Sequence, residues 1–145
     1  MKILLAADGS PYTSKAATFL STHLEWFQEK PELHLLHVKL PIPSGLAVEQ
    51  ARKILGDPAV DDYYRDESKA ALAPAETIFR EQGIPFESHY KVGEVAPKIQ
   101  AYAAKHGIDL IVMGSHGHSA LMGVVLGSVA TKVLAMSTVP VLIVR

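Results

Sequence analysis

Cysteine is absent from this chain of 145 residues, which excludes disulfide scaffolds, cysteine-ligated zinc, iron–sulfur clusters and thiol catalysis. An excess of positive charge is also lacking, because 14 Lys and Arg residues stand against 15 Asp and Glu residues. No cationic surplus is therefore available to drive non-specific binding to phosphate backbones. The sequence also lacks the run of about 18 apolar residues that a membrane-spanning helix needs. We expect no nucleic-acid partner and no membrane partner.

The residues that are present describe one globular domain. Apolar residues make up 48% of the sequence, and at this length folding should bury roughly 68–70% of the unfolded chain's surface. We expect a single domain over residues 1–145 that needs no structural metal for stability. The apolar run before Asp8 is shorter than the roughly 7–15 residues of a signal-peptide core. We therefore expect a cytoplasmic protein.

Short apolar runs alternate along the chain with longer segments of helical periodicity. The runs predict five strands, at 3–7, 33–38, 86–92, 110–113 and 139–144. Apolar residues at steps of three or four predict helices at 16–27, 71–79, 95–102 and 129–136. Right-handed β-α-β units of this kind build an α/β fold, an open parallel sheet with helices on both faces. Such sheets bind ligands beyond the carboxyl ends of their strands.

Prolines and glycines indicate where the predicted helices begin and end. Pro11 fits the first position of the first helix, and Gly107 closes the third. Pro74 predicts that the second helix is kinked or begins late. The connection at 41–57 is longer than usual and leaves room for a short helix.

The most informative segment, 113–130, follows an apolar strand, contains four glycines and opens an amphipathic helix. Glycines let backbone N–H groups approach an anion closely. We predict Ser128 as the cap of the helix, where its hydroxyl and the first helical amides would suit a phosphate. The alternative interpretation is that these glycines only make turns. Their position at the end of a central strand favours phosphate binding.

Several familiar motifs are missing from this segment. No lysine precedes Ser128, so the segment is not a P-loop, and no Gly-x-Gly-x-x-Gly fingerprint occurs. Ser119 lies in a sequence that is similar to a hydrolase nucleophile elbow but lacks its final glycine. His116 and His118 have no third ligand at metal-site spacing and are typical of solvent-facing loop residues. We predict no catalytic residue and no metal-ligating residue.

The spacing of the glycines points to a family. Gly114, two residues, Gly117, nine residues and then Gly127-Ser128 resembles the signature of the ATP-binding universal stress proteins. Further segments resemble landmarks of that family in the same order, at 2–10, 36–38, 109–114 and 140–144. The resemblance covers the whole chain except 41–65.

This resemblance implies a sheet with strand order 3-2-1-4-5, the adenine nucleotide alpha hydrolase-like fold, with ATP lying across the ends of strands 1, 2 and 4. It also implies Mg²⁺ or Mn²⁺ carried by the phosphates, and a homodimer through the C-terminal strand 139–144. On the nucleoside side it implies Ala7, Asp8 near the ribose or a metal-bound water, the backbone of Val38 at the adenine edge, and Met113 and Gly114. On the phosphate side it implies Gly117, Gly127, Ser128 and Val129.

His118 departs from the family pattern, because many relatives carry arginine or lysine at this position. A histidine side chain is mostly neutral at pH 7, so we expect ATP to bind more tightly at pH 6 than at pH 8. The expected function is that of a nucleotide-dependent regulatory module in the stress response, with an unknown protein partner and at most slow ATP hydrolysis or autophosphorylation. The alternatives are a slow ATPase or phosphotransfer enzyme, and a family member that binds another adenine nucleotide such as AMP.

Overall fold

A five-stranded parallel sheet forms the centre of the protein, which we describe from a computed structural model of residues 1–43 and 45–145. The strands follow the order β3-β2-β1-β4-β5, as predicted. Their bounds are Lys2–Ala6 for β1, Glu32–Lys39 for β2, Phe86–Val92 for β3, Leu110–Gly114 for β4 and Val141–Val144 for β5. The strand order reverses at β1, which lies between β2 and β4. This reversal is where a parallel sheet leaves a crevice at its carboxyl end.

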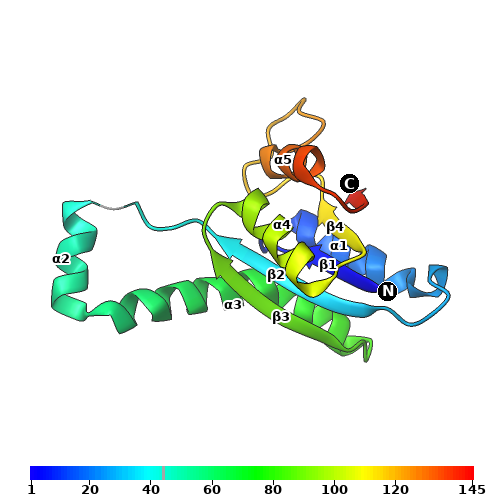
Figure 1. The fold of residues 1–145 in the computed structure, drawn as a ribbon, viewed down its shortest axis with the longest axis horizontal. Coiled ribbons are helices and arrows are strands. Elements are labelled where there is room, and N and C mark those ends of the chain that lie inside the picture. The colour runs from blue at the N-terminus through cyan, green and yellow to red at the C-terminus, as the bar shows by residue number, and fades with distance from the viewer. Residues whose placement is uncertain (44) are drawn as a thin grey trace.

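Helices cover both faces of the sheet, so the α/β class is confirmed (Figure 1). The helices are α1 (Pro11–Thr22), α2 (Leu46–Leu55), α3 (Asp57–Glu81), α4 (Val95–His106) and α5 (Ser128–Met136), with a 3₁₀ turn, η1, at Leu24–Trp26. Helices α1 and α3 pack on one face, and α4 and α5 pack on the other. No helix within 1–43 and 45–145 is both long and apolar enough to cross a membrane.

Both faces of the central strands are buried, which explains why the strand sequences are almost continuously apolar. In β1, Ile3 and Leu5 pack with Phe79 of α3, whereas Leu4 points to the opposite face and packs with Ile99 of α4. All five residues are at most 1% exposed. The alternation of the strand therefore divides one short run of apolar residues between two cores.

The second predicted helix differs from the structure in length. Helix α3 runs for 25 residues and contains Pro74 in its interior, so the prediction of a late start was wrong. Leu72, Ala75 and Phe79 are buried on both sides of this proline. We infer that their burial outweighs the cost of about 3 kcal/mol that a proline imposes inside a helix. The first half of α3 is polar and gave no apolar signal.

Helix α2 and the first half of α3 extend away from the sheet (Figure 1). No residue of α2 is buried, and the first buried residue of α3 is Ser68. Helix α2 is the short helix for which the sequence left room in the 41–57 connection. The first helix ends earlier than its apolar spacing predicted, because α1 stops at Thr22 and the chain continues into η1.

Candidate functional site

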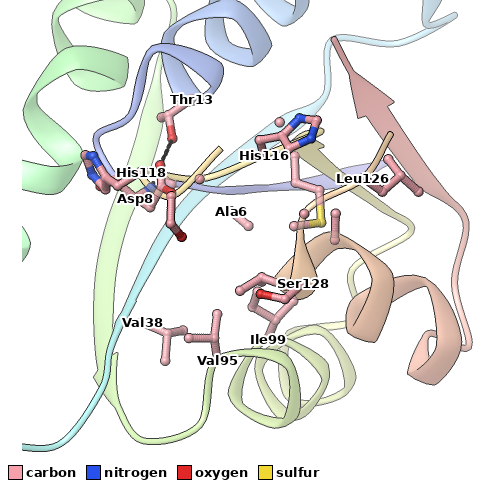
Figure 2. A pocket seen from close by; sticks show the side chains of 18 of the residues that line it. Ala6, Asp8, Thr13, Val38, Val95, Ile99, His116, His118, Leu126 and Ser128 are labelled. Atoms are coloured by element: carbon pink, nitrogen blue, oxygen red, sulfur yellow. Dashed lines mark hydrogen bonds between the residues drawn. The ribbon is translucent and has the colours of Figure 1, made fainter. Parts of the chain in front are cut away.

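A cavity of about 690 Å³ opens at the carboxyl ends of β1, β2 and β4 (Figure 2). Its walls come from these strand ends, the first turn of α4, the 115–127 loop and the start of α5. All nine residues that the sequence predicted as binding residues line it: Ala7, Asp8, Val38, Met113, Gly114, Gly117, Gly127, Ser128 and Val129. Five of them lie at or directly after the end of a strand, and parallel strands end at the same edge of the sheet; the other four come from the loop after β4 and the start of α5.

One wall of the cavity is apolar. Val38 of β2 and Val95 and Ile99 of α4 lie side by side along it (Figure 2), and Met113 of β4 also contributes to the lining. Sequence reasoning missed Val95 and Ile99 as site residues. Their spacing of four residues was read only as the buried face of a helix, because the same pattern serves core and cavity alike. An apolar wall of this kind suits the flat surface of a heterocyclic base.

Asp8 is held in one orientation by the turn that follows β1. Its Oδ1 atom accepts hydrogen bonds from the Thr13 hydroxyl at 2.8 Å and from the Ser10 N–H at 2.9 Å. The Thr13 hydroxyl oxygen accepts in turn from the Asp8 N–H at 3.0 Å. The Oδ2 atom points toward Gly117, where a Cβ would approach it to 2.6 Å. One carboxylate oxygen is thus fixed by the protein, and the other faces the glycine-rich loop.

The 115–127 loop returns to its starting point before α5 begins. The Gly127 N–H donates to the Ser115 carbonyl at 2.7 Å. A Cβ on Gly127 would lie 3.2 Å from the Cα of His116 and 3.3 Å from that carbonyl, closer than most side chains tolerate. Glycine at position 127 therefore allows the loop to close tightly beneath the start of the helix.

The start of α5 supplies backbone donors to the cavity. Gly127 is the N-cap, and no side chain caps the helix. The N–H groups of Ser128, Val129 and Ala130 have no acceptor within the helix, because its first backbone bond runs from Thr131 to Gly127. All three residues line the cavity. Ser128 is thus the first helical residue, and its predicted place as the cap was wrong by one position because Gly127 takes the extended cap conformation.

The two loop histidines bind the backbone. His118 Nε2 donates to the Asp8 carbonyl at 2.6 Å, and the ring lies beside Asp8, away from Ser128 (Figure 2). His116 Nε2 lies 2.7 Å from the Val124 carbonyl, and its Nδ1 lies 3.0 Å from the Ser115 hydroxyl. These contacts fasten the loop to itself and to the end of β1. The predicted effect of His118 on the pH dependence of ATP binding stays a prediction.

A buried histidine, His37, holds the chain segment that follows β1. His37 Nδ1 donates to the Ala7 carbonyl at 2.7 Å, and the residue is 8% exposed. Burial lowers the pKa of His37 despite the opposing effects of this hydrogen bond and of the nearby Asp8 charge. His37 is therefore a neutral donor at pH 7, and it fixes the chain where β1 meets the cavity.

Positive charge is scarce around the cavity. Lys39 is the one Lys or Arg among the described lining residues. Its Nζ atom lies 3.2 Å from a carboxylate oxygen of Glu67, and this hydrogen bond raises the pKa of Lys39. The site thus offers an anion mainly backbone N–H groups, together with the Ser128 hydroxyl.

Comparison with known proteins connects this arrangement to a family. The universal stress protein family model matches residues 1–145. Universal stress protein YxiE from Bacillus subtilis (strain 168) is 36% identical over 152 residues, which cover 99% of this chain and 98% of YxiE.

Solved structures share the fold over the whole chain. The structure of MJ0577, a protein of Methanocaldococcus jannaschii, matches with a TM-score of 0.78 and 26% identity, covering 99% of this chain and 94% of that one. The universal stress protein from Archaeoglobus fulgidus in complex with dAMP matches with a TM-score of 0.66 and 23% identity, covering 100% and 98%. At this identity the second likeness concerns the fold alone.

Proposed function

This chain belongs to the universal stress protein family, and on that premise we propose that it binds an adenine nucleotide, ATP in particular, in the cavity at the carboxyl end of the sheet. One observation carries the proposal: the free N–H groups that open α5 and the apolar wall of β2 and α4 line the same cavity. A nucleotide needs both surfaces at once, because its base is apolar and flat and its phosphates are anionic. The dAMP held by a relative of the same fold agrees with this chemistry.

The two ends of the nucleotide would meet different surfaces. The base would lie against Val38, Val95 and Ile99. The phosphates would accept hydrogen bonds from the N–H groups of Ser128 and Val129, whereas the Gly127 N–H is already bonded to the Ser115 carbonyl. Asp8 would then stand near the ribose, because its free Oδ2 atom can accept a hydrogen bond from a ribose hydroxyl group, whereas its negative charge would repel a phosphate. Mg²⁺ or Mn²⁺ would arrive with the phosphates.

We infer a regulatory role in the stress response for this site, with at most slow hydrolysis or autophosphorylation. Efficient phosphoryl transfer uses a positioned base and cations on the transferring group. Lys39 is paired with Glu67, and His118 donates to the Asp8 carbonyl. Bound nucleotide would order the 115–127 loop and so change the surface that a protein partner meets.

Isothermal titration of the nucleotide-free chain with ATP, AMP, GTP and adenosine in the presence of magnesium tests the proposal. ATP should bind more tightly than GTP, and the difference between ATP and adenosine should give the contribution of the phosphate contacts. AMP binding as tight as ATP binding would favour the alternative of a monophosphate-binding family member. Neither heat nor a rise in melting temperature at millimolar nucleotide would contradict the proposal.

Single-turnover hydrolysis distinguishes a regulatory module from an enzyme. The wild type and Gly127→Val should be compared, because the larger side chain would collide with His116 and Ser115. A rate constant above about 1 s⁻¹ in the wild type, lost in the variant, would favour the ATPase alternative. We expect a much lower rate.

We further propose a homodimer that forms through β5. This strand stands at the edge of the sheet and pairs with β4 on one side. An apolar edge strand with unpaired backbone groups is a template for pairing with a second copy.

A further inference from the structure

A second group of chemically active side chains lies on the α4 face of the sheet, near the amino end of β2. It comprises His34 of β2 and Glu87 and His89 of β3, which we call the histidine cluster. The strand register pairs His34 with Glu87, and His89 follows two residues later, so the three side chains share one face. The nucleotide cavity opens at the opposite ends of these strands.

The donor atoms of the histidine cluster already lie close together. Each residue offers one ligand atom, and these atoms all lie within 4.8 Å of one another. His89 Nε2 lies 3.3 Å from Glu87 Oε2. A zinc ion holds imidazole nitrogen and carboxylate oxygen at about 2.0–2.2 Å, so its ligand atoms stand roughly 3.5 Å apart. Glu87 is exposed and His89 is half-buried, so rotation of these two side chains can close the remaining distance.

His34 provides the fixed part of this arrangement. It is 2% exposed, and its Nδ1 atom lies 2.8 Å from the hydroxyl of Tyr102 in α4. A tyrosine hydroxyl can either donate a hydrogen bond to this nitrogen or accept one from it. Metal-binding histidines commonly have such a partner on their second ring nitrogen, which sets the orientation of the ring.

We propose that the histidine cluster binds a divalent transition-metal ion, with Zn²⁺ as the best match to its two imidazoles and one carboxylate. His34 is the buried anchor, and Glu87 and His89 close on the ion from the exposed side. The site is distinct from any magnesium that a nucleotide would carry, because it lies at the other end of the strands and depends on nitrogen ligands.

His106 of α4 lies near the histidine cluster and could supply a further nitrogen ligand. Its ring centroid is 5.8 Å from that of His34 and 6.1 Å from that of His89. Coordination by His106 would tie the last turn of α4 to the sheet.

The surrounding charges decide which cations fit. Glu32 Oε1 lies 3.0 Å from His34 Nε2, the nitrogen that Tyr102 leaves for the ion, so zinc would have to replace this hydrogen bond. Lys2 Nζ, 3.4 Å from the same Glu32 oxygen, would remain as the partner of that carboxylate. Glu87 is left to offset the charge of a bound ion. Mg²⁺ prefers six oxygen ligands in octahedral geometry and keeps several waters, whereas zinc accepts four ligands with nitrogen among them. Zinc should therefore bind in the presence of millimolar Mg²⁺.

Titration of the nucleotide-free full chain with Zn²⁺ in a magnesium buffer tests the site by calorimetry. The variants are His89→Ala and Glu87→Gln, and the matched control is His23→Ala, because His23 lies at the end of α1 outside the cluster. We expect one zinc per wild-type chain, at least about tenfold weaker binding in both cluster variants, and unchanged binding in the control. Circular dichroism shows whether each variant is folded.

Thermal unfolding provides a second measurement. Zinc should raise the melting temperature of the wild type and of His23→Ala but not that of His89→Ala. The proposal is overturned if the wild type shows no saturable zinc binding at micromolar concentrations, or if both cluster variants bind zinc as the wild type does. Loss of binding in His118→Ala with retention in His89→Ala would assign the zinc to the loop histidines and overturn the proposal as well.

Discussion

The free carboxylate oxygen of Asp8 occupies the space that a side chain at Gly117 would need, because a Cβ on Gly117 would approach Asp8 Oδ2 to 2.6 Å. This contact joins the end of β1 to the glycine-rich loop across the cavity. Glycine is therefore required at position 117 for a steric reason, since its backbone does not adopt a positive φ.

Gly117→Ala should weaken nucleotide binding by about tenfold, or roughly 1.4 kcal/mol, because the methyl group must displace either the loop or the Asp8 carboxylate. Titration calorimetry with ATP measures the effect. Gly45→Ala is the matched control, since a Cβ there meets no atom within 4 Å. Equal affinity in Gly117→Ala and the wild type would show that the Asp8 contact does not matter for binding.

Ser128→Asp should have opposite effects on stability and on binding. A carboxylate in the first turn of α5 favours the helix by about 0.3–1 kcal/mol through the helix dipole. The same charge should lower ATP affinity by about 10- to 100-fold through repulsion of the phosphates, with little effect on adenosine. Ser128→Asn controls for side-chain size. If ATP and adenosine weaken equally in Ser128→Asp, the phosphates do not lie at the start of α5.

His37 should make the protein less stable as the pH falls below about 6.5. The pKa of His37 is lower in the folded state than in the unfolded chain. As the pH decreases, the unfolded chain is therefore protonated at His37 before the folded protein is, and the free energy of unfolding decreases. His37→Gln keeps a donor for the Ala7 carbonyl but does not titrate. Urea unfolding at pH 7.5, 6.5 and 5.5 should show a steeper loss in the wild type. His106 has a lowered pKa in both proteins, so parallel losses would show that His37 does not contribute.

Ile143→Pro should convert the proposed dimer into a monomer. The Pro140 carbonyl accepts from Ile111 and the Val144 carbonyl accepts from Ser115, so the backbone of even-numbered residues in β5 faces β4. By alternation, Ile143 directs its N–H to the free edge, and proline removes that donor. Light scattering after gel filtration measures the mass, and Ile143→Val is the control. A wild type that is monomeric at micromolar concentration would contradict the proposed dimer itself.

His118 should make ATP binding tighter at pH 6 than at pH 8, because its protonation adds positive charge beside the cavity. Calorimetry in matched salt, repeated with His118→Gln, separates this effect from the titration of ATP itself. The same pH dependence in both proteins would assign it to another group.

The strand order came from the family resemblance, whereas the parallel α/β class and the location of the site followed from local patterns. Ala7, Val38 and Met113 each lie at or next to the end of a strand, and that position alone gathers them. Val95 and Ile99 were missed because cavity-lining and core residues share one helical spacing. The polar first half of α3 carries no apolar stripe, so its length was not readable.

The histidine cluster could not be predicted from the sequence, for a different reason. His34 and Glu87 stand 53 positions apart and meet only through the register of β2 on β3. The register of neighbouring strands depends on how whole faces pack, which no local pattern specifies. The proximity of His34, His89 and His106 therefore emerged only in the fold.

Helix α4 contributes Val95 and Ile99 to the nucleotide cavity and Tyr102 and His106 to the surroundings of the histidine cluster. It is an unbroken rod of 12 residues, about 18 Å long. If the proposed nucleotide and metal both bind, a tilt imposed on the first turn by one ligand would move the last turn, which faces the other. Thermodynamic reciprocity would then require that nucleotide and metal alter each other's affinity by the same factor.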